Sequence, residues 1–405
     1  MMDQAVLWEW LNFGLRWLHA ITAIAWIGSR FYFIALDLGL RRRSDLADGA
    51  HGEEWQVHGG GFYHVQKYLV APPQMPEHLT WFKWEAYSTW LSGFALMVVM
   101  YYFGADLFLI DPEVMDLSPA WAIAMSLSSI VAGWIVYDRL CRSRLGADPT
   151  RLMPALYGVL VLMSLFYANV FSGRAALLHL GAFTATIMAA NVAMIIIPNQ
   201  KKVVADLVAG RQPDPGLGAQ AKQRSLHNNY LTLPVLFLML SNHYPLAFAT
   251  QYNWLIAALV FLMGVTIRHF FNTMHARKGM LWWTWGVTGA IFIVIVWLSG
   301  FRPADPAEDV ALTPAQARLV ADARFAEVRD VVLGRCSMCH AAEPLWQGVP
   351  IAPKGVALET DADIARHARM IYLQAGVSRA MPPGNLTWIE PRERRLIAAW
   401  YEGAR

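Results

Sequence analysis

Two cysteines and a histidine near the carboxyl end have a spacing that suggests chemistry. Cys336 and Cys339 are three positions apart and His340 follows directly, which gives the pattern C-x-x-C-H. This pattern is the signature of covalent c-type haem attachment, in which two thiols one turn apart bind the porphyrin and the adjacent imidazole binds iron. A zinc knuckle is the alternative. We predict a covalent haem c held by Cys336, Cys339 and His340.

The residues around this motif favour haem over zinc. The amphipathic stretch Pro314–Leu333 leads into it as a helix would, and Glu390–Ala404 has the pattern of a closing helix. Met381 stands before two prolines, which stiffen an extended segment, and a methionine opposite histidine raises the haem potential. We predict Met381 as the second axial ligand. Two other methionines are weaker candidates, expected in the core: Met338 and Met370.

Three histidines lie within or at the ends of long apolar segments: His19, His179 and His243. Ionisable residues in membrane spans are costly and usually face a partner or a site. A hydrogen bond between helices is the simple alternative. We predict that two of the three bind a b-type haem, His19 and His243 being favoured. Arg16 would then pair with a propionate, unless it only reaches the headgroups.

A further set of polar residues lies in residues 37–87, which are rich in histidine, glycine and aromatic side chains. Gly59, Gly60 and Gly61 permit a turn and a close backbone approach, so His58 and His64 could converge there. Zinc binding would lack cysteine ligands. A solvated surface loop and a substrate or proton-relay surface remain as alternatives.

The composition indicates where these residues are held. The 405 residues (45.4 kDa) are 56% hydrophobic and 16% charged, with a mean hydropathy of +0.33, whereas soluble domains are about 25% charged. The charge is concentrated after residue 300. We therefore predict a membrane protein with a soluble tail and exclude one large soluble enzyme. A net charge of +3 without a basic tract gives no reason to expect nucleic acid, and three cysteines exclude a disulfide framework.

Long apolar runs predict about eight membrane spans. Every second loop is rich in Lys and Arg, and these loops together contain seventeen such residues. The remaining loops contain only Arg174. Basic residues mark the cytoplasmic side, so both ends and the three histidines named above lie toward the outside. Haem attachment on the outer face of bacterial membranes agrees with this. The spans are expected at about 10–36, 88–109, 119–139, 152–171, 174–197, 230–248, 251–270 and 281–300.

The expected fold is all-α, a polytopic transmembrane helical bundle followed by a small soluble α-helical c-type cytochrome domain. The expected parts are a membrane domain at 1–300 with its inner loop at 37–87, a linker at 301–312 rich in proline and acidic residues, and the cytochrome domain at 313–405.

Several segments resemble known families. The stretch 19–32 resembles the opening helix of the CopD/HemJ-like membrane proteins, in which the histidine is associated with b-type haem. Together with 55–63, 79–87 and 227–245, it is similar to the membrane-bound, cytochrome c-containing urate hydroxylases of the PuuD type. This resemblance covers essentially the whole chain.

The resemblance implies a bacterial inner-membrane enzyme of purine catabolism with a periplasmic cytochrome domain. It would oxidise urate to 5-hydroxyisourate and pass electrons to a soluble cytochrome c or a terminal oxidase of the respiratory chain, with lipid as its surroundings. The residues alone indicate only a membrane redox protein that delivers electrons outward.

Urate is an anion at neutral pH, so an electropositive pocket and a general base are expected. The candidates for binding the anion are Arg30 and either Lys67 or Lys83. The candidates for proton transfer are His58 and His64. The alternative is that these residues are ordinary surface charges or pack the loop. The alternative function is a quinol- or partner-fed electron-transfer cytochrome without substrate chemistry of its own. A third alternative, transport of urate or copper, is disfavoured because a transporter would have no evident use for a covalent haem.

Overall fold

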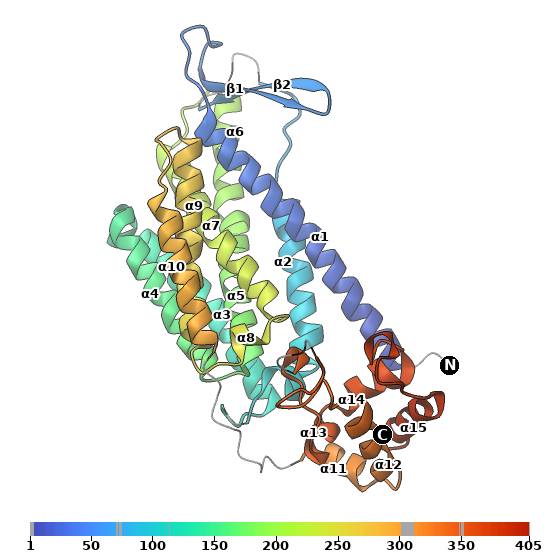
Figure 1. Cartoon of the computed structure of the whole chain (residues 1–405). Coiled ribbons are helices and arrows are strands. Elements are labelled where there is room, and N and C mark those ends of the chain that lie inside the picture. Colours follow the sequence, from blue (N-terminus) through green and yellow to red (C-terminus); the bar gives the residue numbers. More distant parts are fainter. Residues whose placement is uncertain are drawn as a thin grey trace. The chain divides into compact units, whose positions relative to one another are not determined.

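The computed structural model describes residues 4–69, 72, 75–112, 114–300, 312–347, 349 and 352–404. The chain is mainly helical (Figure 1) and forms two compact units. The helical unit comprises residues 12–302, and the carboxyl-terminal unit comprises residues 303–405 together with 1–11. Most of the predicted linker, 301–311, lies outside the described residues.

Long helices form most of the helical unit, and every predicted span overlaps one of them. The helix α7 differs most, because it begins about four turns before the expected start at 230. The α-helices of this unit are α1 (Gln4–Gly39, which starts in the other unit), α2 (Trp84–Met97), α3 (Pro119–Arg142), α4 (Pro149–Ala168), α5 (Gly173–Ala190), α6 (Ile197–Val208), α7 (Pro215–Ser241), α8 (Pro245–Phe248), α9 (Asn253–His275) and α10 (Trp283–Ser299).

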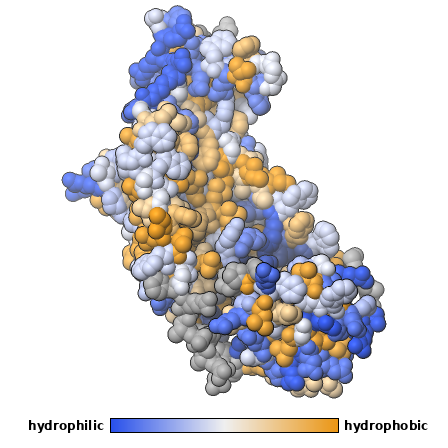
Figure 2. Space-filling model, in the orientation of Figure 1, coloured by the Kyte–Doolittle hydropathy of each residue, from blue (hydrophilic) through white to orange (hydrophobic). Residues whose placement is uncertain are grey.

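Five helical segments in the described part of the chain are long and apolar enough to cross a membrane. Apolar side chains gather on the face of the helical unit seen in Figure 2, which is compatible with a lipid surrounding. The helix α10 is apolar but shorter. The count of about eight spans therefore stays a prediction. The five segments are 6–39, 119–142, 149–168, 173–208 and 253–275.

Two of the long helices contain π-helical turns. The α5 helix continues through η4 (Asn191–Ile196) into α6, and α2 is followed by η1 (Val98–Tyr102) and η2 (Ala105–Leu109). Pro198, the second residue of α6, lacks the N–H that would continue regular α-helical bonding. Such π turns widen a helix locally and are frequent at functional sites.

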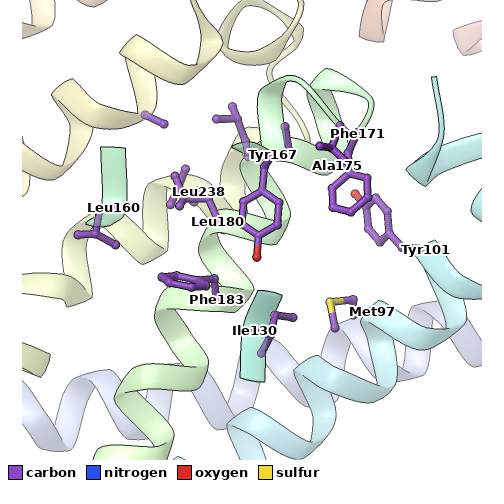
Figure 3. Packing of buried hydrophobic residues seen from close by; sticks show 14 of the residues in the cluster. Met97, Tyr101, Ile130, Leu160, Tyr167, Phe171, Ala175, Leu180, Phe183 and Leu238 are labelled. Carbon is purple, nitrogen blue, oxygen red and sulfur yellow. The ribbon is translucent and has the colours of Figure 1, made fainter. Parts of the chain in front are cut away.

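The core of the helical unit is closely packed around α3, α4 and α5 (Figure 3). Tyr167, Phe171 and Phe183 are among its fully buried side chains. A Cβ atom at Gly133 of α3 would overlap the ring of Phe183 on α5, so glycine is required for this approach. Small residues allow helix backbones to come close where the hydrophobic effect between helices is weak.

The segment after α1 contains a β-hairpin, an element that the all-helical prediction did not include. Strands β1 (Ala50–His58) and β2 (Gly61–Tyr68) pair antiparallel. Gly59 and Gly60 form the turn with φ of +59° and +80°, a left-handed conformation that glycine adopts without strain. The order expected for residues 37–87 thus takes the form of a hairpin.

The carboxyl-terminal unit has its own apolar core. Trp400 of α15 is fully buried, packs against Phe325 of α12, and donates its indole N–H to the Leu319 carbonyl at 2.9 Å. The single helix expected over Pro314–Leu333 is two helices, because Asp322 accepts the Arg324 backbone N–H and turns the chain. The elements are α11 (Pro314–Ala321), α12 (Phe325–Arg335), η5 (Pro353–Gly355), α13 (Asp361–Arg366), α14 (Ala368–Ile371), η6 (Tyr372–Val377), η7 (Pro383–Asn385) and α15 (Pro391–Gly403).

Candidate functional site

The C-x-x-C-H residues form a turn directly after α12. The backbone N–H groups of Cys339 and His340 both donate to the Cys336 carbonyl, at 3.1 and 2.9 Å. Both thiols are free, and burial raises the pKa of the Cys336 thiol to about 11. The turn therefore presents two thiols and an imidazole from one short segment.

The His340 ring is held in an orientation that suits an iron ligand. Its Nδ1 lies 2.9 Å from the Val356 carbonyl, which accepts the proton and leaves the lone pair on Nε2. A backbone hydrogen bond also joins His340 to the segment that contains Val356, since the Leu358 N–H donates to the His340 carbonyl at 2.7 Å. Ligating histidines commonly donate their second nitrogen to a backbone carbonyl. These residues fit a c-type haem.

Two large apolar side chains near the turn are exposed. Leu345 is 86% exposed and its N–H donates to the Met338 carbonyl within the motif. Trp388 is 79% exposed and follows Thr387, whose hydroxyl donates to the Arg335 carbonyl just before the motif.

Met381 lies in a backbone segment that is anchored at both sides. Its N–H donates to the Gln374 carbonyl at 2.9 Å, and its own carbonyl accepts from the buried Arg394 guanidinium at 2.8 Å. The side chain is half-buried. Its role as the sixth ligand stays a prediction.

The three histidines expected to bind a b-type haem lie in different surroundings. His19 of α1 contacts α2, where its Nδ1 is 3.0 Å from the Thr89 carbonyl and Gly93 leaves room for its ring. His179 of α5 is fully buried against aromatic rings, and its Nε2 has no partner. His243 is exposed in the turn after α7. Arg16 donates to Asn12 and contacts the sulfur of Met100.

The predicted proton-transfer residues of the hairpin do not converge. His58 pairs with Gly61 in the register, whereas His64 pairs with Trp55, so the two imidazoles project from opposite faces of the hairpin. His64 lies 2.7 Å from a Glu53 carboxylate oxygen and stacks on Trp55.

The two lysines proposed for anion binding also lie at this end of the helical unit. Lys67 donates to Asp37 at the end of α1, which already neutralises its charge. Lys83 stands at the start of α2 with its ammonium 5.5 Å from the Trp84 ring centroid. Any role of His58, His64 or Lys67 with substrate stays a prediction.

A buried polar network around α7 was not expected from the sequence. Asn191 of η4 donates to the Tyr137 hydroxyl at 2.9 Å and to Asn228 Oδ1 at 2.8 Å. The Tyr137 hydroxyl lies 2.8 Å from His227 Nδ1. All four side chains are buried. The network ties α3, η4 and α7 together through phenol, imidazole and amide groups.

A second group of polar side chains surrounds Asn229, the next residue of α7. Arg268 of α9 donates to Asn229 Oδ1 at 2.8 Å and to Asn272 Oδ1 at 3.1 Å. Its guanidinium also lies 4.4 Å from the centroid of the Phe31 ring on α1, which is a cation–π distance. Arg268 lies near the end of the expected span 251–270 and is a buried helical residue.

Two further arginines, one on α1 and one on α7, have nitrogens without a hydrogen-bond partner. Arg30 of α1 donates one nitrogen to the Ser225 carbonyl at 3.3 Å, while its Nε is inaccessible to solvent and has no partner. Arg224 pairs with Asp138 at 2.7 Å and lies over the Tyr137 ring, but its Nε and Nη1 are unpaired. Arg224 precedes the expected start of the span at 230 but lies inside the α7 helix.

A signal for this network exists in the sequence. The run His227-Asn228-Asn229 precedes an apolar segment, and its amide side chains are poor candidates for a lipid-facing surface. The apolar segment predicted a span that begins only at 230, after these three residues, although the helix already includes them. The buried polar residues were missed because their partners lie far away in sequence.

The fold and the buried polar network define a class of protein, a helical protein with several segments able to cross a membrane and a polar site inside the helical unit. The chain belongs to the urate oxidase N-terminal family, whose sequence model matches residues 5–299. This match makes it a urate-related protein and indicates an oxidoreductase. No curated protein and no solved structure matches the chain significantly.

Proposed function

We propose that the chain is a membrane-bound oxidoreductase that converts urate to 5-hydroxyisourate and delivers the electrons to a covalent haem c in its carboxyl-terminal unit. The observation that carries the proposal is the family match over residues 5–299. The C-x-x-C-H turn supports the electron-transfer part, because it has the two thiols and the oriented His340 described above. The turn lies outside the residues that the family model matches.

The proposed reaction balances without molecular oxygen. Urate and one water give 5-hydroxyisourate, two protons and two electrons. Cys336 and Cys339 would hold the haem by thioether bonds, and His340 and Met381 would bind its iron. Bound there, the group would supply one-electron acceptance. A soluble cytochrome c or a terminal oxidase would then receive the electrons.

Anaerobic addition of urate to the purified, oxidised full-length protein tests the proposal. We expect haem reduction in the absorption spectrum together with 5-hydroxyisourate formation. One urate should reduce two chains if each has one haem, and one chain if each has two. Reduction by quinol but not by urate would support the alternative, an electron-transfer cytochrome without substrate chemistry.

The proposal includes a second, b-type haem in the helical unit, held by two of His19, His179 and His243. A relay is needed if substrate reacts near the inner face, because a bilayer core is about 30 Å thick. His179 is the best supported ligand, since its buried Nε2 lacks a partner, whereas the exposed His243 is less suitable.

We predict that acidified acetone extracts this second haem and leaves the covalent haem on the polypeptide. The pyridine haemochrome spectrum of each fraction checks the result. Retention of all haem on the polypeptide would give the histidines another role and place substrate oxidation close to the carboxyl-terminal unit.

The proposed location is the bacterial inner membrane, with about eight spans and a periplasmic carboxyl-terminal unit. We predict that a reporter active only outside the cytoplasm works when fused after Arg405 and fails when fused at Ala209, directly after α6. A second cytoplasmic fusion at Lys278, after α9, should also be inactive. Activity at Ala209 would contradict the orientation.

A further inference from the structure

We propose that the buried polar residues around Arg30 and Asn191 form the substrate pocket and that this pocket binds a planar, purine-like anion. The inference rests on the proposed function and assigns its binding site. These polar residues lie where α1, η4 and α7 meet: Arg30 of α1 contacts the Ser225 carbonyl of α7, and Asn191 of η4 contacts Asn228 on the same helix.

The charge balance of this region calls for an anion. In the part of the chain that the structure describes, Arg224 has a carboxylate partner, Asp138, whereas the ion pairs include no carboxylate for Arg30 or Arg268. These two donate to neutral amide and carbonyl oxygens. A charge in a membrane interior is costly unless it is paired, so a bound anion would stabilise this arrangement.

The unpaired atoms match both kinds of group on a purine edge. Arg30 Nε and Arg224 Nε and Nη1 are donors without partners, and Asn191 Oδ1 is an acceptor without one. A urate-like anion alternates carbonyl oxygens with N–H groups around its rim. A buried polar atom without a hydrogen-bond partner is unfavourable, so a ligand that pairs with it would stabilise the site. Guanidinium donors would take ring oxygens or the anionic nitrogen, and the amide oxygen would accept a ring N–H.

Aromatic side chains border the same region and suit a flat ligand. Trp26, one turn before Arg30 on α1, packs with Trp81 and Tyr87 around a small apolar cluster. The same cluster includes Val192, the residue after Asn191. Aromatic rings beside a few placed polar groups are typical of small-molecule sites.

The pocket also gathers segments that are distant in sequence. The stretches 19–32 and 79–87, which the sequence analysis singled out, meet at the aromatic cluster. The stretch that begins at His227 supplies the amide partner of Asn191. A shared ligand would explain why polar and aromatic residues from these three stretches lie together.

Urate binding to dithionite-reduced, full-length protein tests the site, because reduced haem prevents turnover. Equilibrium dialysis with labelled urate should show binding by the unaltered protein. Arg30→Gln should weaken it by about ten- to a hundredfold, the effect of losing a hydrogen bond to a charged group, and Arg30→Lys by less. Asn191→Asp, nearly equal in size, should also weaken binding through repulsion. Arg139→Gln, which removes an exposed charge on α3, is the matched control.

The outcomes separate this inference from the proposed function. Loss of binding in Arg30→Gln and Asn191→Asp with normal binding in Arg139→Gln supports the pocket. If the first two variants elute as folded protein and bind urate normally, the pocket is wrong and the function stands. If Arg30→Gln does not fold, Asn191→Asp decides. If the unaltered protein neither binds urate nor is reduced by it, the proposed function itself fails.

Discussion

Protein carrying both Cys336→Ala and Cys339→Ala is expected to contain no covalently bound haem. The two thiols are the groups that form thioethers, and the turn that presents them has no other sulfhydryl. His340 alone would hold a haem only by coordination. Haem staining after denaturing electrophoresis should therefore be absent, and urate should no longer support reduction of added cytochrome c.

The third cysteine provides the control for this prediction. Cys141 is buried in α3 of the helical unit, 3.9 Å from His227, and Cys141→Ala should keep its covalent haem. Haem staining that persists in the double variant would show that the C-x-x-C-H turn is not the attachment site, and the zinc alternative would then need a metal analysis.

Local patterns were enough to predict most helices. Long apolar runs specify helices because a buried or lipid-facing backbone must satisfy its own hydrogen bonds, and the expected closing helix at Glu390–Ala404 is α15. The break at Asp322 was missed because one side-chain hydrogen bond decides it. Such a bond competes locally with helix formation and leaves the amphipathic pattern unchanged.

The hairpin could be predicted only in part. The glycines indicated a turn, and both Gly59 and Gly60 adopt positive φ there. The register depends on which two glycines occupy the turn, and a shift of one residue reverses the faces of all side chains. For this reason the sequence did not reveal that His58 and His64 project to opposite sides.

The buried network shows why the candidate site was only partly predicted. Arg30 could be named from its position in an apolar run, but its partner Ser225 is nearly two hundred positions away. Asn191 is similar, since its geometry depends on a π turn before a proline. Hydrogen bonds between distant helices follow from packing, which periodicity and composition do not specify.

Met381→Ala is expected to keep the covalent haem and to lower its reduction potential. Attachment requires the two cysteines, whereas the axial ligands tune iron, and a histidine–methionine pair raises the potential; axial ligation spans roughly 0.8 V among haem proteins. The anchored backbone on both sides of Met381 should keep the loop in place when the thioether is removed. A redox titration measures the shift.

Met338→Ala and Met370→Ala, which change more exposed methionines, should leave the potential close to that of the unaltered protein. If Met381→Ala leaves the potential unchanged and one of these two lowers it, that methionine is the sixth ligand.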